Sequence, residues 1–252
     1  MTPVAALPMY DWPERRAEVD AQWIVLRDRL RARGFDAPDY LTRRNGDLPP
    51  VPGGIRDASG AVIAPDPATL PPDELDLPAL WRHPALLLAQ TCWGPMELGL
   101  AAHVHVAGQD DYSGVAGGDE AFYSSAIVMR RGEGLAVAPP RGGEPVLPVD
   151  RLRGKRFAFN SPDSMSGYLA MERDLALQGE GFALFARLVE TGGHRLSIEA
   201  VASGRADVAA IDCKSWALAQ RHHEAASALI VVGWTGRRKG LPFVSAFEGV
   251  AV

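Results

Sequence analysis

The sequence is poor in cysteine and has no long apolar run. Cys92 and Cys213 are the two cysteines among its 252 residues, and cysteines so far apart fit neither a zinc site nor a disulfide framework. We expect both to remain thiols, packed as small buried side chains. The longest apolar stretches, such as 85–89 and 229–232, fall far short of the roughly 20 residues that a membrane-spanning helix needs. The sequence therefore predicts no membrane insertion.

Charge of one sign is not concentrated anywhere either. The chain has 26 basic and 31 acidic residues, a net charge of −5, and their mixing leaves no basic face of the kind that binds nucleic acid. Residues 1–10 lack the basic start and the apolar stretch of an export signal. We therefore expect a cytoplasmic protein, unless a signal was removed from a periplasmic one. Because no metal-ligand spacing and no glycine-rich nucleotide loop is found, no cofactor is expected.

The first third of the chain predicts a strand, a helix and a long excursion. The strand is expected at residues 4–10, and the helix starts at Asp11, with Glu14 as its capping partner, and stops at Gly34. Residues 43–78 are crowded with proline, glycine and aspartate, which indicates an excursion rather than a domain. Apolar residues recur at helical spacing and are expected to pack on a sheet: Val19, Trp23, Leu26 and Leu30.

From residue 86 onward, predicted strands and helices alternate. The strands are expected at 86–91, 100–106, 125–130, 157–160, 184–190, 207–211 and 228–232. The helices are expected at 164–178, 195–203 and 214–222. Such alternation indicates an α/β fold with mostly parallel sheets covered by helices. The turn-rich segment 108–120 favours two lobes, with lobe 1 at 1–124, lobe 2 at 125–231, and residues 232–252 returning to lobe 1.

The most informative segment runs from a strand into a serine-rich helix start. Residues 157–168 are FAFNSPDSMSGY, so that Ser164, Ser166 and Gly167 open the helix. The first amides of a helix have no internal acceptor and its dipole attracts anions, which together with hydroxyl donors predicts an oxyanion site. Glycine lets an anion approach the backbone closely. The alternative is that Asp163 or Ser164 only caps the helix.

Two further strand ends are expected at the same edge of the sheet. His194 follows Thr-Gly-Gly at the start of a helix, where its ring can donate to an oxyanion. Asp212 ends a buried strand, and its carboxylate would accept from a ligand that keeps a proton or carries an ammonium group. Each has a structural alternative, since His194 can be a packed core residue and Asp212 can cap the next helix.

Four more polar or aromatic side chains stand at or beyond strand ends. Tyr10, Gln90 and Thr91 lie in the predicted lobe 1, and Tyr123 lies next to the boundary. They are placed to meet a ligand held by the serine segment, although tyrosines at such positions also pack against loops.

Nine segments together resemble the phosphate, phosphite and phosphonate substrate-binding proteins of ABC transporters. They are 7–14 (LPMYDWPE), 87–92 (LLAQTC), 111–113 (DYS), 123–128 (YSSAIV), 154–160 (GKRFAFN), 164–168 (SMSGY), 191–194 (TGGH), 204–213 (GRADVAAIDC) and 240–243 (GLPF). The resemblance spans nearly the whole chain and implies the type II periplasmic-binding fold, two α/β lobes on a two-stranded hinge. It also implies an oxyanion held by Ser164, Ser166, Gly167 and His194, and a surrounding shell of Tyr10, Tyr123 and Asp212.

We therefore expect a solute-binding protein rather than an enzyme. It would capture a phosphate-like or phosphonate-like oxyanion between its lobes by hinge closure, and an ABC transporter permease is its expected partner. Two alternatives stay open, an enzyme on the same fold similar to chorismate dehydratase and a ligand sensor. The turn Trp93-Gly94, and Ser124 where a basic residue often follows the tyrosine, depart from the family pattern and leave the identity of the oxyanion open.

Overall fold

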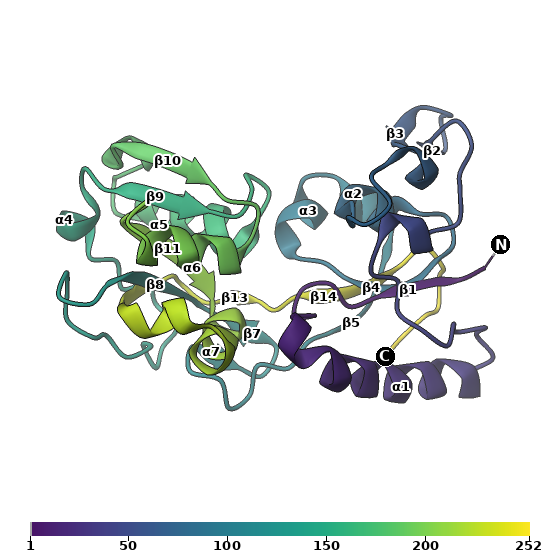
Figure 1. The fold of residues 1–252 in the computed structure, drawn as a ribbon, viewed down its shortest axis with the longest axis horizontal. Coiled ribbons are helices and arrows are strands. Elements are labelled where there is room, and N and C mark those ends of the chain that lie inside the picture. Colours follow the sequence, from purple (N-terminus) through teal and green to yellow (C-terminus); the bar gives the residue numbers. More distant parts are fainter. Residues whose placement is uncertain (1) are drawn as a thin grey trace. The chain divides into compact units, whose positions relative to one another are not determined.

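The chain forms two compact units in the computed structural model, which describes residues 2–252 (Figure 1). Unit 1 comprises residues 2–110 and Leu241–Val252, and unit 2 comprises Asp111–Gly240. The chain passes between units twice, after Asp110 and after Gly240, whereas the sequence prediction placed the crossings near 123–125 and 231–233. The difference arises because Phe122–Tyr123 pairs with Arg238–Lys239 inside unit 2, which draws the segment before residue 125 into that unit.

Unit 1 is built on a four-stranded sheet in the order β1-β4-β14-β5. Its strands are β1 (Val4–Ala6), β4 (Leu86–Gln90), β14 (Pro242–Ser245) and β5 (His105–Gln109). Strands β1 and β4 are parallel, and the other two pairs are antiparallel. The predicted strand at 100–106 is wrong in position, because Gly99, with φ of 113°, starts a 3-10 turn at Leu100–Ala102 that delays the strand to His105.

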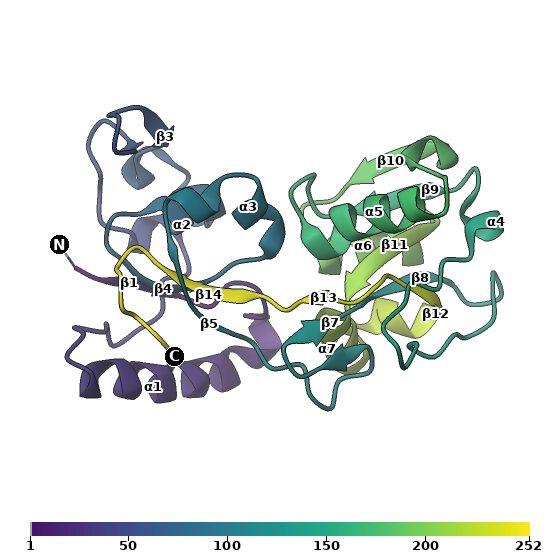
Figure 2. The ribbon, with the colours of Figure 1, turned by 180° about the vertical axis from the view of Figure 1, so that it is seen from behind.

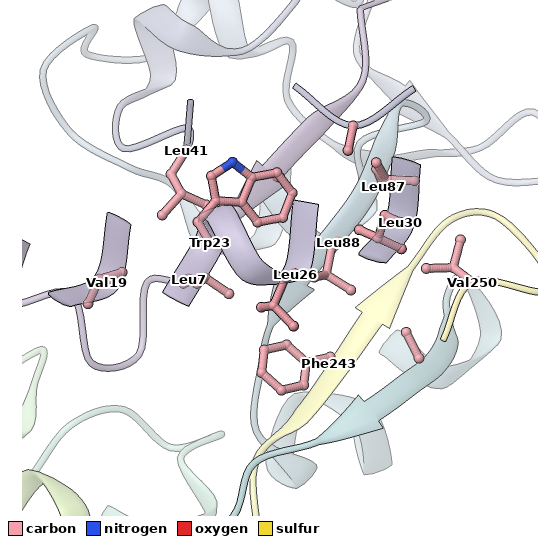
Figure 3. Close-up of a cluster of buried hydrophobic side chains, with 13 residues drawn as sticks. Leu7, Val19, Trp23, Leu26, Leu30, Leu41, Leu87, Leu88, Phe243 and Val250 are labelled. Carbon is pink, nitrogen blue, oxygen red and sulfur yellow. The ribbon is translucent and has the colours of Figure 1, made fainter. Parts of the chain in front are cut away.

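Helix α1 (Arg16–Ala32) packs on this sheet through an apolar stripe. The four residues predicted from helical spacing are all buried and share one cluster with strand residues such as Leu88 and Phe243 (Figure 3). A second cluster around Leu86 lies under α2 (Leu77–Arg82) and α3 (Trp93–Glu97). The helical spacing in the sequence therefore identified the buried face of α1 correctly.

The ends of α1 differ in how well they were predicted. Gly34, with φ of 88°, follows the helix as predicted. At the other end a 3-10 turn, Pro13–Arg15, precedes α1 with Trp12 as N-cap and no side-chain cap, so the Asp11 cap was wrong. Asp11 instead accepts a hydrogen bond from Arg43 Nε at 2.6 Å. The excursion 43–78 stays within unit 1 and contains one hairpin, β2 (Ile55–Arg56) with β3 (Val62–Ala64).

Unit 2 contains a five-stranded sheet in the order β10-β9-β11-β8-β12. Its strands are β10 (Arg187–Glu190), β9 (Arg156–Phe159), β11 (Val208–Asp212), β8 (Ser125–Arg130) and β12 (Leu229–Trp234). Strands β10, β9 and β11 are parallel, but β8 is antiparallel to both its neighbours. The sheets are thus mixed rather than mostly parallel, because a strand's direction depends on distant pairing that local patterns do not record.

In unit 2 a short helix follows β8, and three longer helices follow the parallel strands β9, β10 and β11 (Figures 1 and 2). They are α4 (Val149–Leu152), α5 (Ala170–Leu177), α6 (His194–Ala202) and α7 (Cys213–His222). Met171 and Leu175 of α5 pack with Phe157 and Val208 of the sheet in one core cluster. A smaller sheet joins β6 (Gly118–Asp119), β7 (Phe122–Tyr123) and β13 (Arg238–Lys239).

No helix within residues 2–252 is long and apolar enough to cross a membrane. Cys92 and Cys213 are both thiols, as expected, but whereas Cys213 is buried as predicted, Cys92 is only half-buried. Burial raises the pKa of the Cys213 thiol well above its usual range, and the neighbouring Asp212 adds to the effect.

Candidate functional site

The serine segment begins as a π-helical turn, Met165–Leu169, that continues into α5. Ser164 is the N-cap, because the N–H of Gly167 donates to Ser164 Oγ at 3.1 Å, so the capping interpretation holds for Ser164. The N–H groups of Met165 and Ser166 lie in the first turn, where a helix offers no acceptor. Single π-helical turns are rare in proteins, and those that occur are often found at functional sites. Capping therefore accounts for the serine at position 164 but not for the serine at position 166.

Ser166, His194 and Asp212 come together at one edge of the unit 2 sheet. Ser166 Oγ lies 2.8 Å from His194 Nε2, and the backbone N–H of Asp212 points to the same nitrogen at 3.3 Å. The residues follow β9, follow β10 and end β11, three parallel strands whose carboxyl ends share an edge. The proximity predicted from the strand ends is therefore observed.

These contacts place more donors than acceptors around one ring nitrogen. The Asp212 N–H can only donate and the Ser166 hydroxyl can donate, whereas Nε2 of a neutral histidine has a single lone pair. If Nε2 carries the proton instead, the ring N–H faces the Asp212 N–H. An anionic oxygen bound beside Nε2 would be an acceptor that these groups can share. We call Ser166, His194 and the Asp212 N–H the donor cluster.

The His194 ring is neutral at physiological pH. Burial lowers the pKa of His194 to about 3, because desolvation disfavours the charged form of the ring. The residue is half-buried, while its Nδ1 atom is buried and has no hydrogen-bond partner among residues 2–252. The donor cluster therefore consists of neutral groups.

Asp212 and Tyr123, the two other predicted residues of unit 2, are both buried. The Asp212 carboxylate is buried and accepts from the N–H of Ser215 at 2.8 Å, so it caps α7, as the structural alternative predicted. Tyr123 is buried in β7 and stacks on Tyr112 with ring centroids 5.3 Å apart. Tyr123 was assigned to lobe 1 from the sequence, but the division of the structure places it in unit 2.

Two polar side chains of unit 2 were missed from the sequence. Asn160 directly follows β9 and Ser125 begins β8 opposite Asp212, and the oxygens Asn160 Oδ1 and Ser125 Oγ are buried without a partner in the described chain. A Cβ atom placed on Gly167 would lie 2.9 Å from Asn160 Oδ1 and 3.1 Å from Ser164 Oγ. A larger residue there would displace the side chain of Asn160. The signal for Asn160 was its place as the first polar residue after an apolar strand.

The remaining predicted residues, Tyr10, Gln90 and Thr91, lie buried in unit 1. Gln90 Nε2 donates to Asp110 Oδ2 at 3.0 Å, whereas Thr91 Oγ1 is buried with no partner in the described part of the chain. A pocket of about 160 Å³ in this unit is lined by other residues, Asp11, Thr42 and Arg43 among them. The structure thus separates the predicted residues into a connected set in unit 2 and a second set in unit 1.

No group of three His, Cys, Asp or Glu side chains within residues 2–252 is arranged to hold a metal ion.

The fold is that of the two-lobed, type II periplasmic binding proteins. Solved structures of this class match the chain. A binding protein component of an ABC phosphonate transporter from Pseudomonas aeruginosa matches with a TM-score of 0.58 and 16% identity, over 98% of this chain and 70% of its own. PhnD1 from Prochlorococcus marinus (MIT 9301), solved in complex with methylphosphonate, matches with a TM-score of 0.53 and 21% identity. That match covers 67% of this chain and 59% of PhnD1, so the chain spans less than two thirds of that relative.

Within this class the sequence identifies one family. Residues 100–245, more than half of the chain, match the model of the ABC transporter, phosphonate, periplasmic substrate-binding proteins, and the protein belongs to this family. The resemblance drawn from the sequence is thereby confirmed, and the enzymatic alternative receives no support. No curated protein matches the sequence.

Proposed function

We propose that this protein binds a small phosphonate-like or phosphate-like oxyanion at the donor cluster of unit 2. The observation that carries the proposal is the convergence of the Ser166 hydroxyl and the Asp212 N–H on His194 Nε2 at 2.8 and 3.3 Å. A ligand oxygen near Nε2 would accept from all three groups at once, and hydrogen bonds to a charged acceptor are the strong ones. Membership of the substrate-binding family agrees with this use.

The other predicted residues would act around this centre. Gly167 and the first-turn amides let the anion approach the backbone, and the Asp212 carboxylate accepts from a protonated or ammonium-bearing ligand. Ser164 contributes through the cap that shapes the turn. Contributions from Tyr123 and, after hinge closure, from Tyr10, Gln90 and Thr91 stay predictions of the sequence.

We also propose delivery of the ligand to an ABC transporter permease in the periplasm. The family description names both the transporter and the periplasmic location, and PhnD1 was solved with methylphosphonate. Methylphosphonate is therefore the first ligand to test, ahead of phosphite, phosphate and 2-aminoethylphosphonate.

Isothermal titration of the wild type and two serine variants tests the proposal. Ser166→Ala removes a donor from the cluster, whereas Ser161→Ala is the matched control, because the Ser161 hydroxyl in the same loop already donates to Asp163. We expect micromolar or tighter binding of methylphosphonate to the wild type and a loss of at least tenfold, about 1.4 kcal/mol, in Ser166→Ala. Ser161→Ala should stay within about threefold of the wild type.

The opposite result is equally clear. If no phosphorus oxyanion produces heat or raises the melting temperature of the wild type, the proposed ligand class is wrong. If Ser161→Ala and Ser166→Ala lose affinity equally, the donor cluster is not the binding centre.

A further inference from the structure

Asn160 lies between the two loops that form the donor cluster. It is the first residue after β9, and its backbone C=O accepts from the N–H of Gly192 at 2.8 Å. Gly192 belongs to the turn that leads to His194, while the chain after Asn160 leads to Ser164 and Ser166. The backbone of Asn160 is thus tied to one loop and covalently continuous with the other.

The side chain of Asn160 presents an acceptor that the protein leaves unused. Its Oδ1 atom is buried and has no hydrogen-bond partner within residues 2–252. It lies against Gly167, where even one added Cβ atom would come within 2.9 Å of it. Since buried polar atoms are nearly always hydrogen-bonded in native proteins, an exception at a site calls for an explanation.

The neighbouring groups are donors that are already engaged. The N–H of Gly167 donates to Ser164 Oγ, and Ser166 Oγ is within hydrogen-bond distance of His194 Nε2. A carboxamide oxygen accepts and never donates, so Oδ1 cannot itself bind an anionic oxygen. A proton carried by the ligand would satisfy Oδ1.

We propose that Asn160 is a specificity-determining residue that selects an oxyanion with a proton on its anionic group; this inference rests on the proposed function. A hydrogen phosphonate or hydrogen phosphate has a P–OH group that donates to Oδ1. Sulfate and sulfonates of the same shape carry no proton near neutral pH, and their oxygens would meet the Oδ1 lone pairs. Rejection of this kind comes from an unpaired polar group rather than from size.

The test compares methylphosphonate with methanesulfonate, which have similar shape and differ in the proton. Dissociation constants are measured near neutral pH for the wild type, Asn160→Leu and Asn160→Asp. We expect the preference of the wild type for methylphosphonate to shrink at least tenfold, about 1.4 kcal/mol, in Asn160→Leu, which keeps the bulk and removes the acceptor. Asn160→Asp keeps an acceptor and should retain the preference, although its added charge weakens both anions.

Each alternative outcome is decisive. An unchanged preference in Asn160→Leu overturns the inference while the proposed function stands, and if both ligands are also equally weakened, Asn160 only shapes the site. Failure of the wild type to bind methylphosphonate overturns both. If thermal unfolding shows that Asn160→Leu does not fold, Asn160→Ala replaces it with the same expected loss of preference.

Discussion

The two units use His83 and His194 in opposite ways. In unit 1, His83 Nδ1 accepts from the N–H of Ala85 at 3.1 Å, so Nε2 carries the proton and donates to the Pro49 carbonyl at 2.9 Å. In unit 2, Ser166 Oγ and the Asp212 N–H both contact His194 Nε2, and His194 Nδ1 has no partner in the described chain. Burial lowers the pKa of both rings. A histidine with both nitrogens satisfied is structural, whereas one with mismatched nitrogens indicates a place for a ligand.

The same contrast extends to the amides of the two units. Asn45 of unit 1 donates to the Pro71 carbonyl and accepts from the N–H of Asp76, and Gln90 donates to Asp110. Asn160 of unit 2 leaves its buried oxygen without a partner within residues 2–252. An unsatisfied buried group costs stability, and a bound ligand that donates to Asn160 Oδ1 would remove this cost.

The largest expected effect separates the two histidines by stability. We expect His83→Ala to lower the free energy of unfolding by about 3 kcal/mol, because it leaves the Pro49 carbonyl and the Ala85 N–H without partners. His194→Ala should cost less than about 1 kcal/mol, since its contacts are already mismatched. Urea unfolding measures both, and hydrogen exchange assigns the loss to a unit. Equal losses would remove the distinction between a structural and a ligand-binding histidine.

The next effect concerns ligand affinity at the glycine of the π turn. Gly167→Val should weaken methylphosphonate binding at least 100-fold, about 2.7 kcal/mol, because its side chain meets Asn160 Oδ1 and Ser164 Oγ. Gly193→Ala is the matched control, since its backbone is extended and a Cβ there meets nothing within 4 Å. Titration calorimetry that finds both variants equally impaired would show that crowding at Gly167 is not the cause.

A smaller effect is the pH dependence of stability without ligand. The pKa of His194 is about 3 in the folded protein, compared with 6.5 for an exposed histidine such as that of the unfolded chain. Below about pH 6.5 the unfolded chain therefore binds a proton at this ring that the folded chain does not bind. Stability is therefore lost as the pH falls from about 6.5 toward 3. His194→Gln lacks this term, and between about pH 7 and 5 it should lose about 1–2 kcal/mol less than the wild type. Parallel stability curves from urea unfolding would contradict the buried neutral ring.

The fold was predictable where the local pattern was strong. Strand β8 was predicted to the residue and α6 and α7 to within a residue, because a buried apolar strand, the glycines around α6 and the Asp212 cap of α7 leave clear signals. The direction of β8 was not predicted, since antiparallel pairing depends on distant packing, and the position of β5 was not, because the turn that Gly99 starts at Leu100–Ala102 was overlooked.

The candidate site was predictable as a set of strand ends. Ser166, His194 and Asp212 meet because three parallel strands end at one edge, which the alternation in the sequence indicates. The unused oxygens of Asn160 and Ser125 were not predictable, because whether a buried polar atom finds a partner is a property of packing. The ligand-binding roles of Ser166, His194 and Asp212 stay predictions.

The smallest expected effect lies in unit 1, where Gln90 and Thr91 differ within one strand end. The Gln90 amide is already engaged by Asp110, whereas the Thr91 hydroxyl has no partner within residues 2–252. If unit 1 takes part in capture, Thr91→Val should weaken methylphosphonate binding by about three- to tenfold, or 0.6–1.4 kcal/mol, and Gln90→Ala by less than about twofold. Titration of both variants checks this order. Equal losses would mean that Gln90 leaves Asp110 when the ligand binds, and no loss in either would assign capture to unit 2 alone.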